Sequence, residues 1–299
     1  MIDRLVIVGL GLIGGSLARA LKERNAVGEV IGTGRREASL IRGQELGVID
    51  RWTLDLGEAV KDADVVVIAA PTLAAEKVLE SLKPHMRPDL IVTDVASVKG
   101  SLVTAAERIF GEVPAQFVPG HPIAGSEQSG VEASTGDLYV DHRVILTPLP
   151  TTRTDALETI RAMWQATGAE VVDMDVAEHD VVLAATSHLP HVLAYGLVDA
   201  LAQSGSAQAI FRFAAGDFRD FTRIASGDPV MWHDIVRANR GAVLDSLDTF
   251  TEHLAEMRRA IESDDSEAIL ATFERAKAAR DKHFLTQYQV KGKPQGATD

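Results

Sequence analysis

Residues 1–173 alternate short apolar runs with amphipathic stretches of helical length, and this alternation restricts the fold more than any other feature of the chain. The runs that predict strands are Leu5–Val8, Glu29–Gly32, Asp64–Ala69, Leu90–Thr93, Phe117–Val118, Arg143–Thr147 and Glu170–Val172. The stretches that predict helices are Ile13–Lys22, Arg36–Leu46, Thr72–Leu82, Lys99–Phe110 and Asp155–Thr167. Strands that are apolar on both faces and alternate with helices are typical of a parallel sheet covered on both sides. Because crossovers between parallel strands are right-handed, we expect a doubly wound α/β fold.

The pattern changes near residue 173. From Asp175 onward the sequence predicts helices and no strands, beginning with a long helix over Asp175–Gln203 that Pro190 is expected to kink. The further predicted helices are Ala207–Phe213, Pro229–Ser263 with breaks, and Ser266–Tyr288. A chain of 299 residues is long enough for two domains. We therefore expect an α/β domain over residues 1–173, an all-α domain over 174–290, and a disordered tail over 291–299, which is rich in Gly, Pro and Lys.

The composition excludes several classes of function. The chain has no cysteine, which rules out disulfides, thiolate nucleophiles and cysteine-based metal sites. Its net charge of −13 disfavours a nucleic-acid partner, so an anionic small molecule would need a local group of Arg or His side chains. The sequence has no uninterrupted run of about 18 apolar residues, and its N-terminal apolar run is too short for a signal peptide. We expect a cytoplasmic protein with no nucleic-acid partner and no membrane span.

A glycine-rich loop at Gly9–Gly14 follows the first predicted strand and opens the first predicted helix. Its Gly-x-Gly-x-x-Gly spacing allows a tight turn and lets backbone N–H groups approach a pyrophosphate at a helix N-terminus. Alone the motif is weak and could be a structural turn, but its place inside a strand–helix–strand unit is the one that a dinucleotide site requires. We assign the cofactor contacts of this loop to Gly9, Gly11, Leu12, Ile13 and Gly14.

The end of the second predicted strand bears on the choice between NAD and NADP. In NAD-binding Rossmann domains an acidic residue lies about 20 residues past the last glycine and binds the ribose hydroxyl. Gly34 occupies that position here, and Arg35 and Arg36 follow it. The pair could be two solvated surface arginines. However, cations are mildly disfavoured at a helix start, so two arginines there favour a bound anion such as the 2′-phosphate of NADP. NADP is therefore the preferred cofactor and NAD a possible one. Pro71, directly after the third strand, is assigned to the same site.

Two segments that follow predicted strands carry polar residues among small ones. Ligands bind outside the carboxyl ends of the strands in such sheets. Asp94–Gly100 contains Ser97, and Gly120–Ser126 contains His121 followed by a proline. A core histidine is the alternative, but the flanking glycines leave room for a ligand, which favours a functional His121.

The helical half offers a second group of polar candidates. His188 and His191 lie three residues apart on one predicted helix face, on either side of Pro190. A metal site would need further ligands, so a polar patch that faces the substrate is the preferred interpretation and no metal is assigned. Arg223 could clamp a carboxylate with two hydrogen bonds. Alternatively Arg219 and Arg223, four residues apart, only cover a helix surface.

Together these segments resemble the TyrA family of prephenate, arogenate and cyclohexadienyl dehydrogenases. The resemblance runs in order through almost the whole chain, and its most specific part is the His-Pro-Ile-Ala-Gly segment. The matching segments are Gly9–Ser16, Asp94–Gly100, His121–Glu127, Ser187–His191, Thr222–Ala225, Asp228–Pro229 and Met231–Trp232. The resemblance implies an N-terminal doubly wound Rossmann domain and an all-α C-terminal dimerisation domain, and so a homodimer.

The same resemblance implies an activity and residue roles. The family oxidises a cyclohexadienol and expels CO2, which leaves a phenol and requires no metal. His121 would hydrogen-bond the ring hydroxyl with Ser97 beside it, and Arg223 would bind a substrate carboxylate. The side chains implied to line the substrate pocket are Ser126, His188, His191 and Trp232.

Asp220 lies where the family places the residue that selects the substrate side chain. A carboxylate there would attract the ammonium group of arogenate and repel a second carboxylate. The resemblance therefore leans toward arogenate, or toward an enzyme that accepts both arogenate and prephenate.

Two other functions stay open at this point. A β-hydroxyacid or 6-phosphogluconate-type dehydrogenase shares the two-domain plan but uses a lysine on the interdomain helix, and here no lysine occurs between Lys99 and Lys277. A non-catalytic NADP-binding regulator could keep the glycine loop but would not need His121, Ser97 and Arg223 together.

Overall fold

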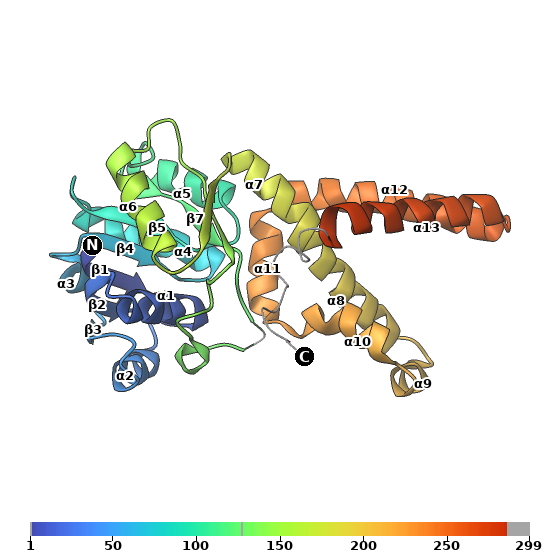
Figure 1. Cartoon of the computed structure of the whole chain (residues 1–299), viewed down its shortest axis with the longest axis horizontal. Coiled ribbons are helices and arrows are strands. Elements are labelled where there is room, and N and C mark those ends of the chain that lie inside the picture. The colour runs from blue at the N-terminus through green and yellow to red at the C-terminus, as the bar shows by residue number, and fades with distance from the viewer. Residues whose placement is uncertain (1, 127, 286–299) are drawn as a thin grey trace, which may run out of the picture. The chain divides into compact units, whose positions relative to one another are not determined.

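The computed structural model describes residues 2–126 and 128–285. Its main sheet is six-stranded and wholly parallel, with the order β3-β2-β1-β4-β5-β6. These strands are β1 (Ile2–Val8), β2 (Val27–Thr33), β3 (Arg51–Thr53), β4 (Val65–Ile68), β5 (Ile91–Asp94) and β6 (Phe117–Val118). The order reverses between β1 and β4, and this crevice is where doubly wound sheets bind nucleotides. The predicted fold class is confirmed (Figure 1).

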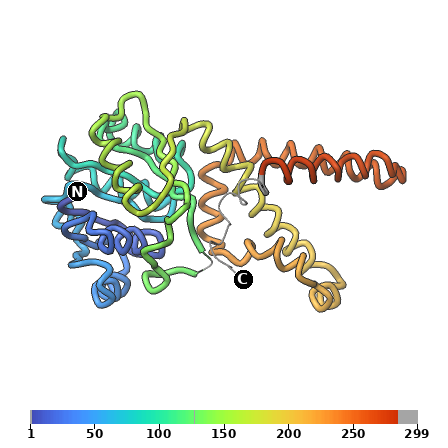
Figure 2. The backbone as a smooth tube through the Cα atoms, in the orientation of Figure 1, coloured from blue at the N-terminus to red at the C-terminus, as the bar shows by residue number. Residues whose placement is uncertain are grey.

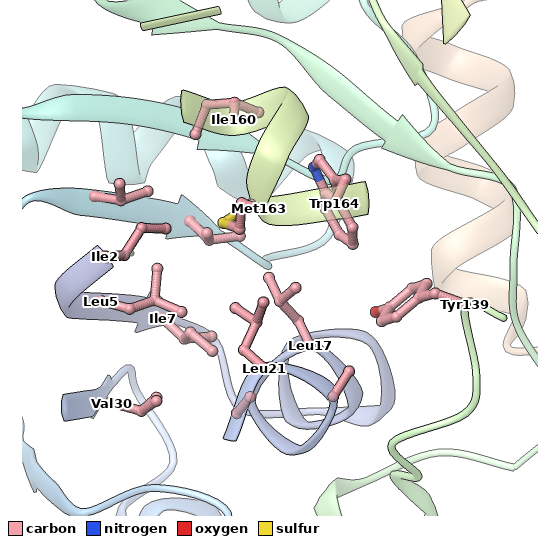
Figure 3. Close-up of a cluster of buried hydrophobic side chains, with 14 of the residues drawn as sticks. Ile2, Leu5, Ile7, Leu17, Leu21, Val30, Tyr139, Ile160, Met163 and Trp164 are labelled. Carbon is pink, nitrogen blue, oxygen red and sulfur yellow. The ribbon is translucent and has the colours of Figure 1, made fainter. Parts of the chain in front are cut away.

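Helices cover both faces of the main sheet because the strands are apolar on both faces. Leu5 and Ile7 of β1 are buried in one core cluster, and Val6 and Val8 in another. Around the sheet lie α1 (Leu12–Glu23), α2 (Glu37–Glu45), α3 (Leu56–Val60), α4 (Thr72–Leu82), α5 (Gly100–Phe110) and α6 (Thr154–Gln165). Side chains of α1, α2 and α6 complete the first cluster, and those of α3, α4 and α5 complete the second. Figure 3 shows side chains of α1 and α6 in the first cluster. The sheet edge that carries the loops is thus held rigidly from both sides.

A second, three-stranded sheet was not predicted. It has the order β7-β8-β9 and consists of β7 (Gly120–Pro122), β8 (Arg143–Leu146) and β9 (Glu170–Asp173). β7 runs antiparallel to β8, and β8 runs parallel to β9. The sequence predicts the last two strands but not β7, which is three residues long and includes Pro122. It also does not predict β3 and α3, since neither shows a clear apolar period.

Every element that the structure describes after Asp173 is helical. These elements are α7 (Val176–Leu183), α8 (Leu189–Ala202), α9 (Ala207–Arg212), α10 (Gly216–Thr222), α11 (Pro229–Ala238), α12 (Arg240–Glu262) and α13 (Ser266–Arg280). Short helical turns are η1 (Lys83–His85), η2 (Val131–Ala133), η3 (Ala184–His188), η4 (Arg223–Ser226) and η5 (Asp281–Leu285). The long helix expected over Asp175–Gln203 is present as α7, the π-helical turn η3 and α8, with Pro190 in the first turn of α8. The kink expected at Pro190 stays a prediction. π-Turns of this kind occur frequently at functional sites.

The stretch Val176–Ala202 passes a test for a membrane span by length and composition alone. Only 22% of its most apolar window is buried within the chain. Within this stretch His179 and Asp180 hydrogen-bond to residues of the α/β part, as described below.

By its internal contacts the chain separates into two compact units, residues 1–243 and 244–299. The first unit contains both sheets and the helices up to α11, and the path of its chain can be followed in Figure 2. In the second unit α12 leads through residues 263–265 into α13. The domain boundary near residue 173 stays a prediction, and the predicted tail over 291–299 lies outside the described residues.

Candidate active site

Two glycines of the loop between β1 and α1 occupy positions that a residue with a side chain would not fit. Gly9 has φ +102°, and a Cβ atom there would lie 2.5 Å from the backbone oxygen of Ala69. A Cβ atom on Gly14 would lie 2.5 Å from the oxygen of Gly9 and 2.8 Å from Cγ2 of Ile7. Gly9 therefore makes the tight turn, and Gly14 lets α1 pack directly against β1.

Gly11 differs from the other two glycines, because a Cβ atom there would meet no protein atom within 4 Å. Gly11 is the N-cap of α1, where no side chain caps the helix and the first turn carries no acidic residue. The N–H groups of Leu12 and Ile13 belong to that first turn, whose orphan donors attract an anion. The loop thus fits the pyrophosphate of a nicotinamide dinucleotide.

The remaining predicted cofactor residues lie at the ends of β2 and β4. Gly34 directly follows β2, and the exposed Arg35 and Arg36 follow it, with Arg36 as the N-cap of α2. Gly34 is near the glycine loop, since a Cβ atom there would lie 3.5 Å from the nitrogen of Gly9. Pro71 is the N-cap of α4. These residues line the same edge of the parallel sheet, where its strands end.

His121 lies at the centre of β7, paired with Ile145 of β8, and only 8% of it is exposed. Its Nδ1 atom is 2.9 Å from Nε2 of His179, and the two rings meet edge to face. Burial holds the pKa of His121 well below the usual 6.5, and the neighbouring His179 and Lys99 lower it further. The ring is therefore neutral at neutral pH and can accept a proton.

His179 contacts a carboxylate through its other ring nitrogen. Its Nδ1 atom is 2.8 Å from Oδ1 of Asp180, and the His179 side chain is fully buried. Asp180 in turn accepts the backbone N–H groups of Lys99 and Gly100, at 2.9 and 2.8 Å, where α5 begins. Burial alone would raise the pKa of Asp180, but the hydrogen bonds from His179 and from this helix start lower it. Asp180 is therefore an anion fixed at a helix N-terminus.

A buried ion pair joins the two loops that carry the site. Lys99 and Asp94 are both fully buried and contact each other directly, and Lys99 Nζ also donates to the oxygen of Gly120 at 2.6 Å. Asp94 accepts the N–H group of Gly120 as well, at 3.2 Å. Burial lowers the pKa of Lys99, and the charge of Asp94 opposes that shift. This pair holds the end of β5 against the backbone next to His121.

His188, at the end of η3, is 1% exposed, and burial lowers its pKa to about 4. Asn239 Nδ2 lies 2.7 Å from the backbone oxygen of Asp180 and 3.1 Å from Nδ1 of His188. The other ring nitrogen, Nε2, is buried and has no hydrogen-bond partner among the residues that the structure describes. Buried polar atoms of proteins are seldom left without a hydrogen bond, so this nitrogen has an unused capacity that a bound water or ligand could satisfy.

His191 and Trp232 form a stacked pair with ring centroids 3.4 Å apart. Trp232 is placed by the start of α11, where Asp228 caps the helix and Pro229 opens it. Burial lowers the pKa of His191, the hydrogen bond to the Ser187 oxygen opposes this shift, and the positive charge of Arg223 adds to it. Arg223 therefore lies close enough to His191 for their charges to interact.

The other predicted substrate residues take more open positions. Ser97 is half-buried in the loop after β5, two residues before Lys99. Ser126 is exposed, and its Oγ accepts the N–H group of Gln128 at 3.2 Å. Asp220 is exposed on α10, 3.6 Å from the guanidinium of Arg219. Over residues 2–126 and 128–285, no group of three or more potential ligands is arranged to hold a metal ion.

Four residues of this arrangement were missed by the sequence analysis: His179, Asp180, Asn239 and the side chain of Lys99. The adjacent His-Asp pair at the start of a predicted helix was a usable signal, because charged residues are seldom placed on a helix face that packs against a sheet. Asn239 carries no such signal in its neighbourhood. Its role follows only from where α11 ends.

Two protein-family models match this chain, one after the other. Residues 17–173 match the family model described as the nucleotide-binding domain of prephenate dehydrogenase. Residues 175–275 match the model described as the dimerization domain of prephenate dehydrogenase.

Individual relatives extend over nearly the whole chain. A cyclohexadienyl dehydrogenase from Zymomonas mobilis is 38% identical over 92% of this chain and 94% of its own length. A prephenate dehydrogenase from Bacillus subtilis is also 38% identical, over 94% of this chain and 76% of its own length.

A solved structure gives the same result. The crystal structure of prephenate dehydrogenase from Aquifex aeolicus, in complex with hydroxyphenyl propionate and NAD+, superposes with a TM-score of 0.88 at 34% identity. The superposition covers 94% of this chain and 98% of the other. The chain therefore belongs to the prephenate dehydrogenase (TyrA) family.

Proposed function

We propose that the protein catalyses the oxidative decarboxylation of arogenate, prephenate or both, with transfer of a hydride to NADP or NAD. The observation that carries this proposal is His121, a buried neutral histidine of β7, the strand that follows the carboxyl end of β6. A metal-free oxidation of a hydroxyl group needs a base of this kind close to the bound nicotinamide. When bound, the cofactor supplies the hydride acceptor.

In this reaction His121 acts on the ring hydroxyl. As the hydride leaves the carbon that bears the hydroxyl, the oxygen becomes electron-poor, and Nε2 of His121 holds its proton. The electrons of the bond to the departing carboxylate then flow into the ring and reach this oxygen, which recovers the proton as the phenol forms. CO2 leaves, and aromatisation makes the step effectively irreversible. Ser97, in the neighbouring loop, would bind the same hydroxyl oxygen.

The opposite side of the substrate requires a cation. Arg223 is the candidate, because its guanidinium can bind a carboxylate with two hydrogen bonds and its charge reaches His191. His188, His191 and Trp232 would line the pocket next to it, and Ser126 would lie at its rim. The unpartnered Nε2 of His188 supports this assignment, because a substrate oxygen would satisfy it.

NADP is the cofactor that we propose as preferred. Arg35 and Arg36 follow β2, where an NAD-specific site would carry an acid, and both are exposed. The Aquifex relative was crystallised with NAD+, so NAD stays the second candidate.

The proposed preference for arogenate depends on Asp220. Its carboxylate would attract an ammonium group, but it is 76% exposed at the side chain and already lies near Arg219. Solvent and this neighbour both weaken its field. We therefore propose an enzyme that uses both substrates with a modest preference for arogenate.

We further propose that the enzyme is a cytoplasmic homodimer whose subunits meet through the helical part. The match of residues 175–275 to a model described as a dimerization domain supports this. So does the distribution of apolar surface, which is described in the Discussion.

Steady-state kinetics with each substrate and each cofactor, followed through the absorbance of the reduced nicotinamide, tests the proposal. We expect turnover of both substrates, and a higher kcat/KM with NADP than with NAD. No turnover in any of the four combinations would reject the function. Turnover of a β-hydroxyacid instead would favour the related dehydrogenase class.

A further inference from the structure

Two histidines of the candidate site are connected through one short segment of the helical half. His121 reaches Asp180 through His179, and His188 reaches the backbone of Asp180 through Asn239. Each contact has a direction, because some of the atoms can only donate and others can only accept. These directions determine where the protons lie on the two catalytic-site rings.

In the first series of hydrogen bonds, from His121 through His179 to Asp180, the donors and acceptors are determined by Asp180. Its carboxylate has only acceptors, so Nδ1 of His179 must donate to it. In the neutral His179 ring Nε2 is then a lone pair, and Nδ1 of His121 must donate to that atom at 2.9 Å. A neutral His121 therefore carries its proton on Nδ1 and presents a bare Nε2.

In the second series, from His188 through Asn239 to the backbone of Asp180, the histidine accepts the hydrogen bond instead of donating it. The backbone oxygen of Asp180 can only accept, which requires the amide nitrogen of Asn239 at that position. The second hydrogen of this nitrogen points to Nδ1 of His188, which must accept it. The single proton of a neutral His188 is then on Nε2, the atom that has no partner among the described residues.

We propose that Asp180 and Asn239 are positioning residues that set opposite tautomers in the two histidines, so that His121 presents an acceptor and His188 a donor to the ligand. This inference rests on the proposed function and adds a division of labour to it. His121 takes the hydroxyl proton, whereas His188 donates to an oxygen of the substrate, such as that of a carboxylate or keto group. The arrangement explains why two buried histidines so close together do not have the same role.

The geometry also explains how the first series of hydrogen bonds supports catalysis. When His121 receives a proton it becomes an imidazolium in a buried site, which is costly without a counter-charge. The lone pair of His179 stabilises the Nδ1–H of that imidazolium, and the anionic Asp180 stabilises His179 in turn. Asp180 itself accepts hydrogen bonds from the two N–H groups at the start of α5, so this series of hydrogen bonds is fixed to the α/β part of the molecule.

Nuclear magnetic resonance of the full-length protein, labelled with 15N in its histidine rings, tests the tautomers directly. We expect a protonated Nδ1 and a bare Nε2 in His121, and the reverse in His188. A proton on Nε2 of a neutral His121, or on Nδ1 of a neutral His188, would overturn the proposal. This readout needs no turnover, so a failure of the proposed function can be told apart from a failure of the tautomer assignment.

Kinetics of substituted enzymes provide a second, independent readout. In Asp180→Asn the amide can present a donor to Nδ1 of His179 and so reverse the first series of hydrogen bonds, and we expect kcat to fall about 10²-fold or more with KM little changed. His179→Phe should do the same, whereas His179→Gln, which keeps a donor and an acceptor, should recover part of the loss. Asn239→Ala should mainly raise KM, because it releases His188.

His142 provides a matched control, since it is an exposed histidine of the α/β part outside this network. His142→Gln should leave kcat and KM within about twofold of the unsubstituted enzyme. Unchanged kcat in a folded Asp180→Asn enzyme would contradict the proposal. If Asp180→Asn does not fold, the ring spectra of the unsubstituted protein still decide the question.

Discussion

His121 combines three properties that a general base in a buried site requires. It is neutral because burial lowers its pKa, it is held in place by one ring nitrogen, and it lies next to an edge of the sheet that can bind a dinucleotide. The price of burying such a ring is that the protein must supply hydrogen-bond partners for it. Residues far apart in the sequence provide these partners, so the proposed role of His121 depends on the packing of the helical half.

We predict that His121→Asn lowers turnover by roughly 10²-fold or more, because the amide cannot accept and return the hydroxyl proton. Affinity for the cofactor should change little, since His121 has no part in the glycine loop. Steady-state kinetics and a fluorescence titration with the reduced cofactor measure the two effects. Full turnover in the substituted enzyme would remove His121 from the mechanism.

The buried histidines also make stability depend on pH. The pKa of His188 is about 4 in the folded chain against 6.5 as its ordinary value, so the unfolded chain binds more protons between these two pH values. The stability that depends on a neutral His188 is therefore fully present above pH 6.5. Because of this one group, the free energy of unfolding should decline by about 1.4 kcal/mol per pH unit as the pH falls toward 4.

Urea unfolding at a series of pH values measures that slope. His188→Gln should have a shallower slope than the unsubstituted protein over this range. His253→Gln is the control, because His253 is an exposed residue of α12. An equally steep slope in His188→Gln would show that His188 is not the titrating group.

Arg35 and Arg36 should separate the two cofactors. We predict that Arg35→Ala combined with Arg36→Ala raises KM for NADP by about tenfold or more, since charge-assisted hydrogen bonds contribute about 1.5–3 kcal/mol each. KM for NAD should change by less than about threefold, because NAD has no 2′-phosphate. Equal changes for both cofactors would assign the arginines a role unrelated to the phosphate.

At the scale of elements, the β1–α1 unit shows how one motif contains residues with different duties. Gly14 is required because a Cβ atom there would clash where α1 packs on β1. A Cβ atom on Gly11 would meet no protein atom, so only a ligand at the start of α1 would require a glycine there. The helix start has no side-chain cap, so its N–H groups remain available for an anion. Fold and binding can therefore be perturbed separately within six residues.

Substituting the two glycines tests that separation. Gly14→Ala should destabilise the chain by at least about 1–3 kcal/mol, because its Cβ atom would overlap the backbone of Gly9. Gly11→Ala should cost less than about 1 kcal/mol, yet raise the cofactor Kd at least about tenfold, since the methyl group lies in the path of the pyrophosphate. Thermal unfolding and a cofactor titration measure the pair. Equal destabilisation by both substitutions would contradict the distinction.

For the whole molecule, the uneven distribution of apolar surface is the main feature. Apart from Ile41, Leu54 and Ile123, every exposed large apolar side chain among the described residues lies between residues 181 and 273. Phe213 is 79% exposed, and Val230 is 66% exposed. These residues lie within the segment that matches the dimerization model, and burying them between two subunits would remove this apolar surface from water.

We predict that the protein sediments with twice the 32.1 kDa mass of one chain. Phe213→Glu combined with Val230→Glu should shift it toward the monomer, because two charges would be buried in the interface. Ile41→Glu, on the exposed surface of α2, is the control and should leave the mass unchanged. A monomeric unsubstituted protein would reject the dimer.

Much of the fold follows from local pattern. The β1–α1 loop, the alternating strands and helices and the change to helices after Asp173 all depend on apolar periods and glycine spacing, which are visible in the sequence. β7 was not visible, because three residues that include a proline have no period and form a strand only by pairing with β8. β3 and α3, of three and five residues, were missed because neither shows a clear apolar period.

The sequence by itself determined which side chains could do the chemistry, because residue type decides what can accept a proton, bind a phosphate or clamp a carboxylate. Only the tertiary structure decided their protonation and direction. His121 is a buried neutral ring because β7 and α7 meet, which brings His179 and Asp180 into its hydrogen-bond network. Asn239 similarly becomes the partner of His188 because the two side chains lie 3.1 Å apart in space. Contacts across about 60 residues of chain depend on packing, which no local pattern encodes.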